Sequence, residues 1–210
     1  MDYLSYFVTA LTTIFVIVDP PGNIPMFIAL TETLDHDLRE RVSKRATMIG
    51  AGILIALAIT GGWLLKVFGV TIDGLRIAGG ILLFMVALDI LMGSRSKEVY
   101  VQRGLKHIDV DSLAVFPIAL PLYTGPGAIT AAIVLNSEAT DLISKLLLIL
   151  AIVIVYVTVR LTHVYSEFII KVLGKSGADI IARIMAIFLA AIGVEFVFAG
   201  LAGKLKAILH

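Results

Sequence analysis

The sequence predicts an all-α integral membrane protein with six membrane-spanning segments, arranged as two inverted repeats of three helices. The chain of 210 residues is 59% hydrophobic, well above the roughly 45–50% apolar content of soluble domains. Its mean hydropathy is +1.01. Apolar segments of spanning length recur along the chain, and short motifs of the first half return in the second half.

Six segments are long and apolar enough to span a bilayer, which requires about 20 mainly apolar residues. The first would measure roughly 46 Å as one continuous helix, which exceeds the apolar core of a membrane at roughly 30 Å. A broken or re-entrant path is therefore expected there, and the fourth segment carries a similar interruption. The six segments are predicted at residues 4–34, 46–66, 73–93, 112–136, 143–164 and 180–203.

The second half of the chain repeats the first. The sequence KVFG at 66–69 returns as KVLG at 171–174, which is 105 residues later. Because each copy contains three spans, the second copy must cross the membrane in the opposite sense. We therefore expect repeats at 1–93 and 112–210, joined by a polar cytoplasmic linker at 94–111.

The distribution of Lys and Arg predicts the orientation, because cytoplasmic loops are enriched in these residues. The first, third and fifth loops are rich in them, and the second and fourth are poor. Both termini are therefore expected outside. The net charge of +1 gives no indication of a nucleic-acid partner, and the oligomeric state is not predicted.

Two Pro/Gly clusters, each inside a long apolar segment, are the most informative motifs. The first is DPPGNIP at 19–25, and the second is PLYTGPGAI at 121–129. Helix breakers at corresponding positions of two halves indicate a transporter binding site. Broken backbone persists in a membrane only where protein or a water-filled cavity satisfies its polar groups. The alternative is a pair of kinked helices without a ligand.

Each break can bind both ends of a small polar molecule. The restarting half-helix has unpaired N–H groups and a positive dipole end, which favour an anion such as a carboxylate. Released carbonyls favour a cation or an ammonium group. The residues expected to bind substrate are Gly22, Asn23, Thr124, Gly125, Gly127 and Ala128. The helix-breaking residues are Pro20, Pro21, Pro25, Pro121 and Pro126.

Two acidic residues inside the segments, Asp19 and Glu195, are the main candidates for ion coupling. Asp19 directly precedes the first break, where a carboxylate costs about 2.5–3.5 kcal/mol and needs a partner or water. It could bind Na⁺, carry a proton or hold a substrate ammonium group, or it could only cap the next half-helix. Glu195 in the sixth segment is the second candidate, and Asp89 near the end of the third is a weaker one.

A candidate gate consists of two Asp/Arg pairs at the start of the third helix of each repeat. Arg76 has Asp73 one turn earlier, and Arg183 has Asp179 one turn earlier. Both spacings allow an intrahelical ion pair. Inverted topology would place one pair at each end of the molecule. The alternative is that these charged side chains lie at helix ends and only extend toward the membrane–water interface, without forming a gate.

Enzyme motifs are not evident in the chain. The four His residues are scattered, Cys is absent, and no nucleophile elbow or phosphate-binding loop occurs. We therefore expect no enzymatic activity and no cofactor, apart from Na⁺ near Asp19.

The segments DPPGNIPMF at 19–27 and PIALPLYTGPGAIT at 117–130 resemble the paired signature of the MarC/SnatA family. The resemblance extends over the whole chain in length and segment pattern. It implies a multi-pass transporter of small neutral amino acids, such as glycine and alanine, in the cytoplasmic membrane, driven by a Na⁺ or proton gradient. Tyr123 and Thr124 depart from the small or apolar residues expected there. The alternatives are an uncoupled channel or exporter of small solutes and a non-transporting scaffold.

Overall fold

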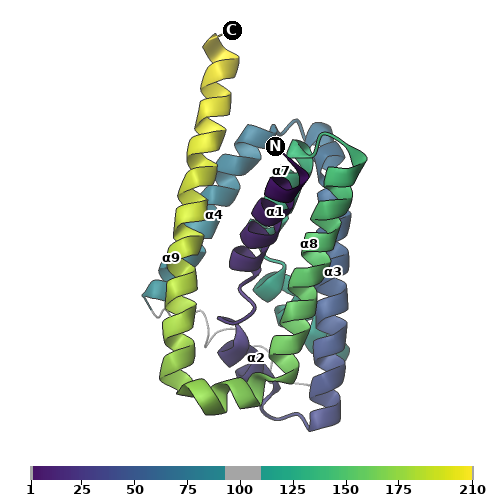
Figure 1. Cartoon of the computed structure of the whole chain (residues 1–210), viewed down its shortest axis with the longest axis vertical. Helices are drawn as coiled ribbons and strands as arrows, with labels where there is room; N and C mark the ends of the chain where they lie inside the picture. Colours follow the sequence, from purple (N-terminus) through teal and green to yellow (C-terminus); the bar gives the residue numbers. More distant parts are fainter. Residues whose placement is uncertain (1, 93–109, 210) are drawn as a thin grey trace.

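The computed structural model describes residues 2–92 and 110–209, and every regular element in this part of the chain is a helix. The predicted all-α class is therefore confirmed. Both chain termini lie at the same end of the molecule (Figure 1). We call this the terminal end, and we call the opposite end, where α2 lies and α3 begins, the loop end. The predicted linker at 94–111 lies almost wholly outside the described residues.

The first apolar segment, predicted over 4–34, consists of two helices with a break between them. α1 covers Tyr3–Val18 and ends at Asp19, whose φ of 48° is left-handed and cannot continue a right-handed helix. The prolines that follow lack an amide proton and also oppose a continuous helix. α2 then covers Ile24–Thr31. The interruption expected from the sequence is therefore present.

The second segment is longer than the predicted 46–66. α3 covers His36–Val67, because the side chain of Asp35 caps its start by accepting a hydrogen bond from the amide of Leu38 at 2.8 Å. The basic residues assigned to the first loop consequently lie on the first turns of α3. The third segment is α4, Ile72–Leu91, close to its predicted position.

The fourth segment, predicted as one span at 112–136, is bent. The helix before the break and the helix after it meet at 60°. Phe116 and Leu120 have extended backbone angles, because each directly precedes a proline and such residues avoid the helical region. Its elements are α6 (Val110–Leu113), η1 (Ala114–Tyr123) and α7 (Pro126–Glu138).

The last two segments are α8 and α9. α8 covers Leu142–Val164, as predicted, and Asp141 caps it. The hydrogen bond from the amide of Ser144 to this carboxylate lowers the pKa of Asp141. α9 covers Ser166–Leu209 and extends beyond the predicted sixth segment on both sides. A left-handed Gly174, with φ of 66°, bends it so that its first part lies across the loop end (Figure 1).

Among the described residues, four helices are long and apolar enough to cross a membrane: α3, α4, α8 and the part of α9 from Asp179 to Ala207. The bent pair of η1 and α7 adds a fifth if it forms one span. α1 has 16 residues, which is short for a span by itself. Large apolar side chains are exposed on α4, α8 and α9, as expected for surfaces that face lipid. The six-span inverted repeat stays a prediction.

The helices form a main core and a separate pair. The core joins α1, α2, α3, η1, α7 and α8, while α4 and α9 pack along each other (Figure 1). Gly80 and Gly193 allow this pair to approach closely, since a Cβ on Gly80 would lie 2.4 Å from the carbonyl oxygen of Gly193. Fully buried side chains of the main core include Ile14, Phe27, Leu54, Ile118 and Ile152.

Candidate functional site

The first break is folded around the carboxylate of Asp19. Its Oδ1 accepts a hydrogen bond from the amide of Gly22 at 3.0 Å, and the residue is only 6% exposed. A Cβ on Gly22 would lie 2.0 Å from Oδ2 of Asp19, so glycine leaves room for the carboxylate. Nδ2 of Asn23 donates to the carbonyl oxygen of Val18 at 3.0 Å and satisfies one group freed at the end of α1. The break is thus an internally bonded turn that holds a buried carboxylate.

The second break restarts as α7. Gly125 precedes this helix in an extended conformation, and Pro126 is its first residue, as the sequence predicts. The amides of Gly127 and Ala128 have no partner within the helix, because the first amides of a helix lack a carbonyl group one turn earlier. The N-cap residue, Gly125, has no side chain that could cap them. A Cβ on Gly127 would lie 2.1 Å from Cδ2 of Leu83, so this glycine allows α7 to touch α4. The second break therefore presents backbone donors beside a close helix contact.

A single cavity of about 600 Å³ is lined by both breaks. The first break contributes Asp19 and Asn23, and the second contributes residues 125–128. The other walls come from α1, α2, η1, α4 and α9. The lining reaches Asp89 of α4 and Asp179 of α9, in the parts of these helices that lie toward the loop end (Figure 1). The fold thus brings together two motifs that are far apart in the sequence.

Thr124, predicted to bind substrate, does not line this cavity. Its side chain is fully buried, and its hydroxyl oxygen lies 2.5 Å from the hydroxyl oxygen of Tyr156 on α8. Gly50 of α3 makes room for this contact, because a Cβ there would lie 2.6 Å from the ring of Tyr156. Thr124 therefore attaches the second break to α8, while its neighbour Tyr123 lines the cavity.

Glu195 and Asp89 are also placed differently from what the sequence suggests. Glu195 is exposed on α9 and is not part of the cavity lining, whereas Asp89 is. Gly22 does not line the cavity, but its lack of a side chain leaves room for the carboxylate of Asp19, which does. Of the predicted helix-breaking residues, Pro121 and Pro126 line the cavity, and Pro20, Pro21 and Pro25 do not.

The two pairs of the candidate gate differ. Arg76 lies 3.5 Å from Asp73, and it also binds Glu138 at the end of α7, at 2.5 Å. Asp179 and Arg183 both line the cavity. Among the described side chains no ion pair joins Asp179 to Arg183. The first pair therefore belongs to a link between α4 and α7 at the terminal end, and the second belongs to the cavity wall.

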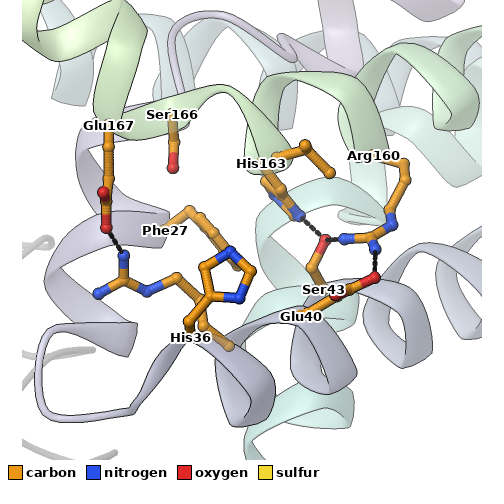
Figure 2. Close-up of a pocket in the computed structure, with 10 residues that line it drawn as sticks. Phe27, His36, Glu40, Ser43, Arg160, His163, Ser166 and Glu167 are labelled. Atoms are coloured by element: carbon orange, nitrogen blue, oxygen red, sulfur yellow. Dashed lines mark hydrogen bonds and ion pairs between the residues drawn. The ribbon is translucent and has the colours of Figure 1, made fainter.

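A smaller, polar pocket of about 150 Å³ lies at the loop end, between α3, α8 and the start of α9 (Figure 2). His163, only 3% exposed, is part of its wall. Its Nδ1 lies 2.8 Å from Oγ of Ser43, and its Nε2 lies 2.7 Å from the hydroxyl oxygen of Tyr123. The ring stacks on Phe27 of α2 with the centroids 3.6 Å apart. His163 thus contacts three other elements.

Charged side chains surround this pocket (Figure 2). The guanidinium of Arg160 donates to Oγ of Ser43 and to Oε1 of Glu40, at 2.8 Å in each case. Arg39 of α3 pairs with Glu167 at the start of α9. Both arginines are therefore engaged with carboxylates at the loop end.

Sequence reasoning missed this polar cluster. The four His residues lack metal-binding spacing in the sequence, and spacing along the chain gives no indication that His163 meets Ser43 and Tyr123. The available signal was the presence of Arg160 and His163 inside an apolar segment. Ionisable residues are rare in such segments and usually have a function.

Known proteins resemble the chain over nearly its whole length. Residues 4–205 match the family described as MarC family integral membrane protein. A UPF0056 membrane protein of Archaeoglobus fulgidus is 61% identical over 97% of this chain and 95% of its own. Similar proteins of Methanocaldococcus jannaschii and Escherichia coli are 38% and 30% identical, and each alignment covers at least 95% of both chains. No solved structure matches the chain. This chain therefore belongs to the MarC family of multi-pass integral membrane proteins.

Proposed function

We propose that this protein is a secondary active transporter of small neutral amino acids, such as glycine and alanine, coupled to Na⁺ or H⁺. The observation that carries the proposal is the cavity of about 600 Å³ that both breaks line. Its volume lies within the range of about 300–1,000 Å³ that is typical of small-molecule sites. Transporters built from inverted repeats bind substrate where two discontinuous helices meet.

A zwitterion matches the groups that face this cavity. Its carboxylate would bind the amides of Gly127 and Ala128 at the start of α7, where the helix dipole adds partial positive charge. Its ammonium group would lie on the side of Asp19, whose carboxylate lines the same cavity. Apolar side chains between the breaks, including Met26 and Leu83, favour a small uncharged substituent.

The ion-coupling role is proposed for Asp19. It is a buried carboxylate at the cavity, and such a group can bind Na⁺ or carry a proton as the cycle proceeds. Glu195 is a weaker candidate, because it is exposed on α9 and lies outside the lining. The hydrogen bond from Gly22 to Asp19 also fits a capping role, and the variant Asp19→Asn distinguishes the two roles.

Alternating access would come from movement of one repeat against the other. The chain runs in opposite directions along α3 and α8, and along α4 and α9, as an inverted repeat requires (Figure 1). The ion pair of Arg76 with Glu138 links the two halves at the terminal end, whereas the cavity lining extends toward the loop end. We propose that the protein lies in the cytoplasmic membrane with its loop end on the cytoplasmic side. In this conformation the cavity would then open toward the cytoplasm.

The test is uptake of labelled glycine and alanine into proteoliposomes, with Na⁺ and pH gradients imposed separately. We expect accumulation above the external concentration under at least one gradient, because a coupled transporter uses the ion gradient. Equilibration without accumulation would support the uncoupled channel or exporter instead. No uptake under either gradient, by protein that unfolds cooperatively on heating, would refute transport of these amino acids.

A further inference from the structure

We propose that the coupling ion is a proton and that Tyr123, His163 and Ser43 form its path between the central cavity and the polar pocket at the loop end. This inference rests on the proposed transport function and specifies its driving ion. Two of the path's three side chains, those of His163 and Ser43, lie outside the lining of the substrate cavity. The path begins at Tyr123, which lines the cavity, and ends at Ser43, which lines the pocket.

The three side chains form one continuous chain of hydrogen bonds. The hydroxyl oxygen of Tyr123 lies 2.7 Å from Nε2 of His163, and Nδ1 of the same ring lies 2.8 Å from Oγ of Ser43. All three residues are at most 3% exposed. The imidazole therefore stands between two spaces, the cavity on the side of Nε2 and the pocket on the side of Nδ1.

The chemistry of this chain allows proton transfer in both directions. A hydroxyl group donates one hydrogen bond and accepts others, and a neutral imidazole has one donor and one acceptor nitrogen. Both tautomers of His163 are therefore compatible with the same two neighbours. An imidazole placed in this way is a common proton shuttle in proteins.

The transfer involves only O–H and N–H bonds. A proton from the cavity binds to the oxygen of Tyr123, whose own proton passes to Nε2 of His163. The proton on Nδ1 then passes to Oγ of Ser43, and the hydroxyl proton of Ser43 leaves to water in the pocket. One proton enters and one leaves, and no phenolate persists. When the conformational change exposes the ring, water protonates Nδ1 and accepts the proton of Nε2, which restores the first tautomer with no net proton moved.

The charged surroundings favour passage of the proton over its storage on the ring. Arg160 donates to Ser43 and brings a positive charge close to the imidazole, which disfavours a lasting imidazolium. Phe27, the contact from α2, carries no charge and packs against the ring face. The other titratable or charged groups around the ring are Tyr123 from η1, His36, Arg39 and Glu40 from α3, and Glu167 from α9.

The position of His163 also explains how the path would respond to transport. The ring forms a hydrogen bond with Tyr123, which belongs to the second break, and it stacks on Phe27 of α2, the helix that follows the first break. Any movement of either break changes the alignment of Tyr123 with Nε2. Proton transfer would therefore be tied to the conformation of the substrate site.

The test compares two activities of the full chain in proteoliposomes. One is alanine accumulation driven by a pH gradient, recorded together with alanine-dependent proton movement by an internal pH dye. The other is exchange of labelled for unlabelled alanine at equal pH, which requires no net proton movement. The variants are His163→Gln and Tyr123→Phe. Tyr6→Phe is the matched control, because it removes a buried tyrosine hydroxyl that bonds to the carbonyl of Leu135 at 2.8 Å, away from the cavity.

We expect both path variants to lose at least tenfold in pH-driven accumulation and in proton movement. His163→Gln, whose residue lies outside the cavity lining, should retain exchange, and the control should retain all three activities. Accumulation driven by Na⁺ alone in the wild type, without proton movement, would overturn the proton path and leave the transport function intact. Unchanged pH-driven accumulation in His163→Gln would overturn it as well. Loss of exchange together with accumulation in His163→Gln would reduce the cluster to a structural role. Absence of any uptake or exchange in the wild type would refute the proposed function itself.

Discussion

Replacement of Gly22 by alanine tests whether the first break positions the buried carboxylate of Asp19. The added Cβ would lie 2.0 Å from Oδ2 and 2.7 Å from Oδ1 of Asp19, whereas real Cβ atoms essentially never come closer than 3.0 Å. The carboxylate would therefore have to move by about 1 Å, given these contact limits. The movement would disrupt the 3.0 Å hydrogen bond from the Gly22 amide to Oδ1.

The size of the effect follows from this hydrogen bond. Hydrogen bonds to charged groups contribute about 1.5–3 kcal/mol. A factor of ten in affinity corresponds to about 1.4 kcal/mol. If Asp19 holds the coupled ion or the substrate ammonium group, the apparent affinity for alanine should fall roughly ten- to a hundredfold.

The assay is the initial rate of alanine uptake into proteoliposomes as a function of alanine concentration. Gly52→Ala in α3 is the matched control, because a Cβ at Gly52 would meet nothing within 4 Å. Thermal unfolding of both variants checks that the comparison is made on folded protein. An affinity in Gly22→Ala equal to that of the control would refute the view that the carboxylate of Asp19 acts in transport from this position.

Three further changes test other parts of the account. Asp19→Asn should abolish ion-driven accumulation while the melting temperature stays nearly constant, and normal accumulation would leave Asp19 with a capping role. Gly127→Ala should lower uptake and stability because its Cβ would lie 2.1 Å from Leu83; a double-mutant cycle with Leu83→Ala should show a coupling of about 1–3 kcal/mol, and strict additivity would contradict the contact. Arg76→Gln should change the free energy of unfolding by only about 1 kcal/mol or less, since its pair with Glu138 is partly exposed, but should alter the rate of alanine exchange. An unaltered exchange rate would exclude a gating role.

Features that depend on local sequence could be predicted. The apolar segments follow from composition over short windows, and the two breaks follow from Pro and Gly, whose backbone restrictions act wherever they occur. The left-handed residue at Asp19 and the helix start at Pro126 both fall inside the predicted motifs. The break positions, unlike the helix ends, therefore needed no tertiary information.

Features that depend on tertiary packing could not be predicted. Helix periodicity does not show that Thr124 faces Tyr156 or that Glu195 is exposed, because the rotation of a helix in a membrane depends on its neighbours. The early start of α3 depends on a cap at Asp35, beyond the apolar stretch used to locate the span. The cluster around His163 joins residues from four elements, so no spacing in the sequence could indicate it.

The most direct test of the central claim is protection of the cavity by substrate. The chain contains no cysteine, so single-cysteine variants can be labelled without background. Ala128→Cys reports on the second break, Met26→Cys reports on the wall next to the first break, and Glu32→Cys is an exposed control. If both breaks hold one small zwitterion, alanine should slow thiol modification at positions 128 and 26 and leave position 32 unchanged. Transport of alanine without protection at either cavity position would contradict the claim that the two breaks form its binding site.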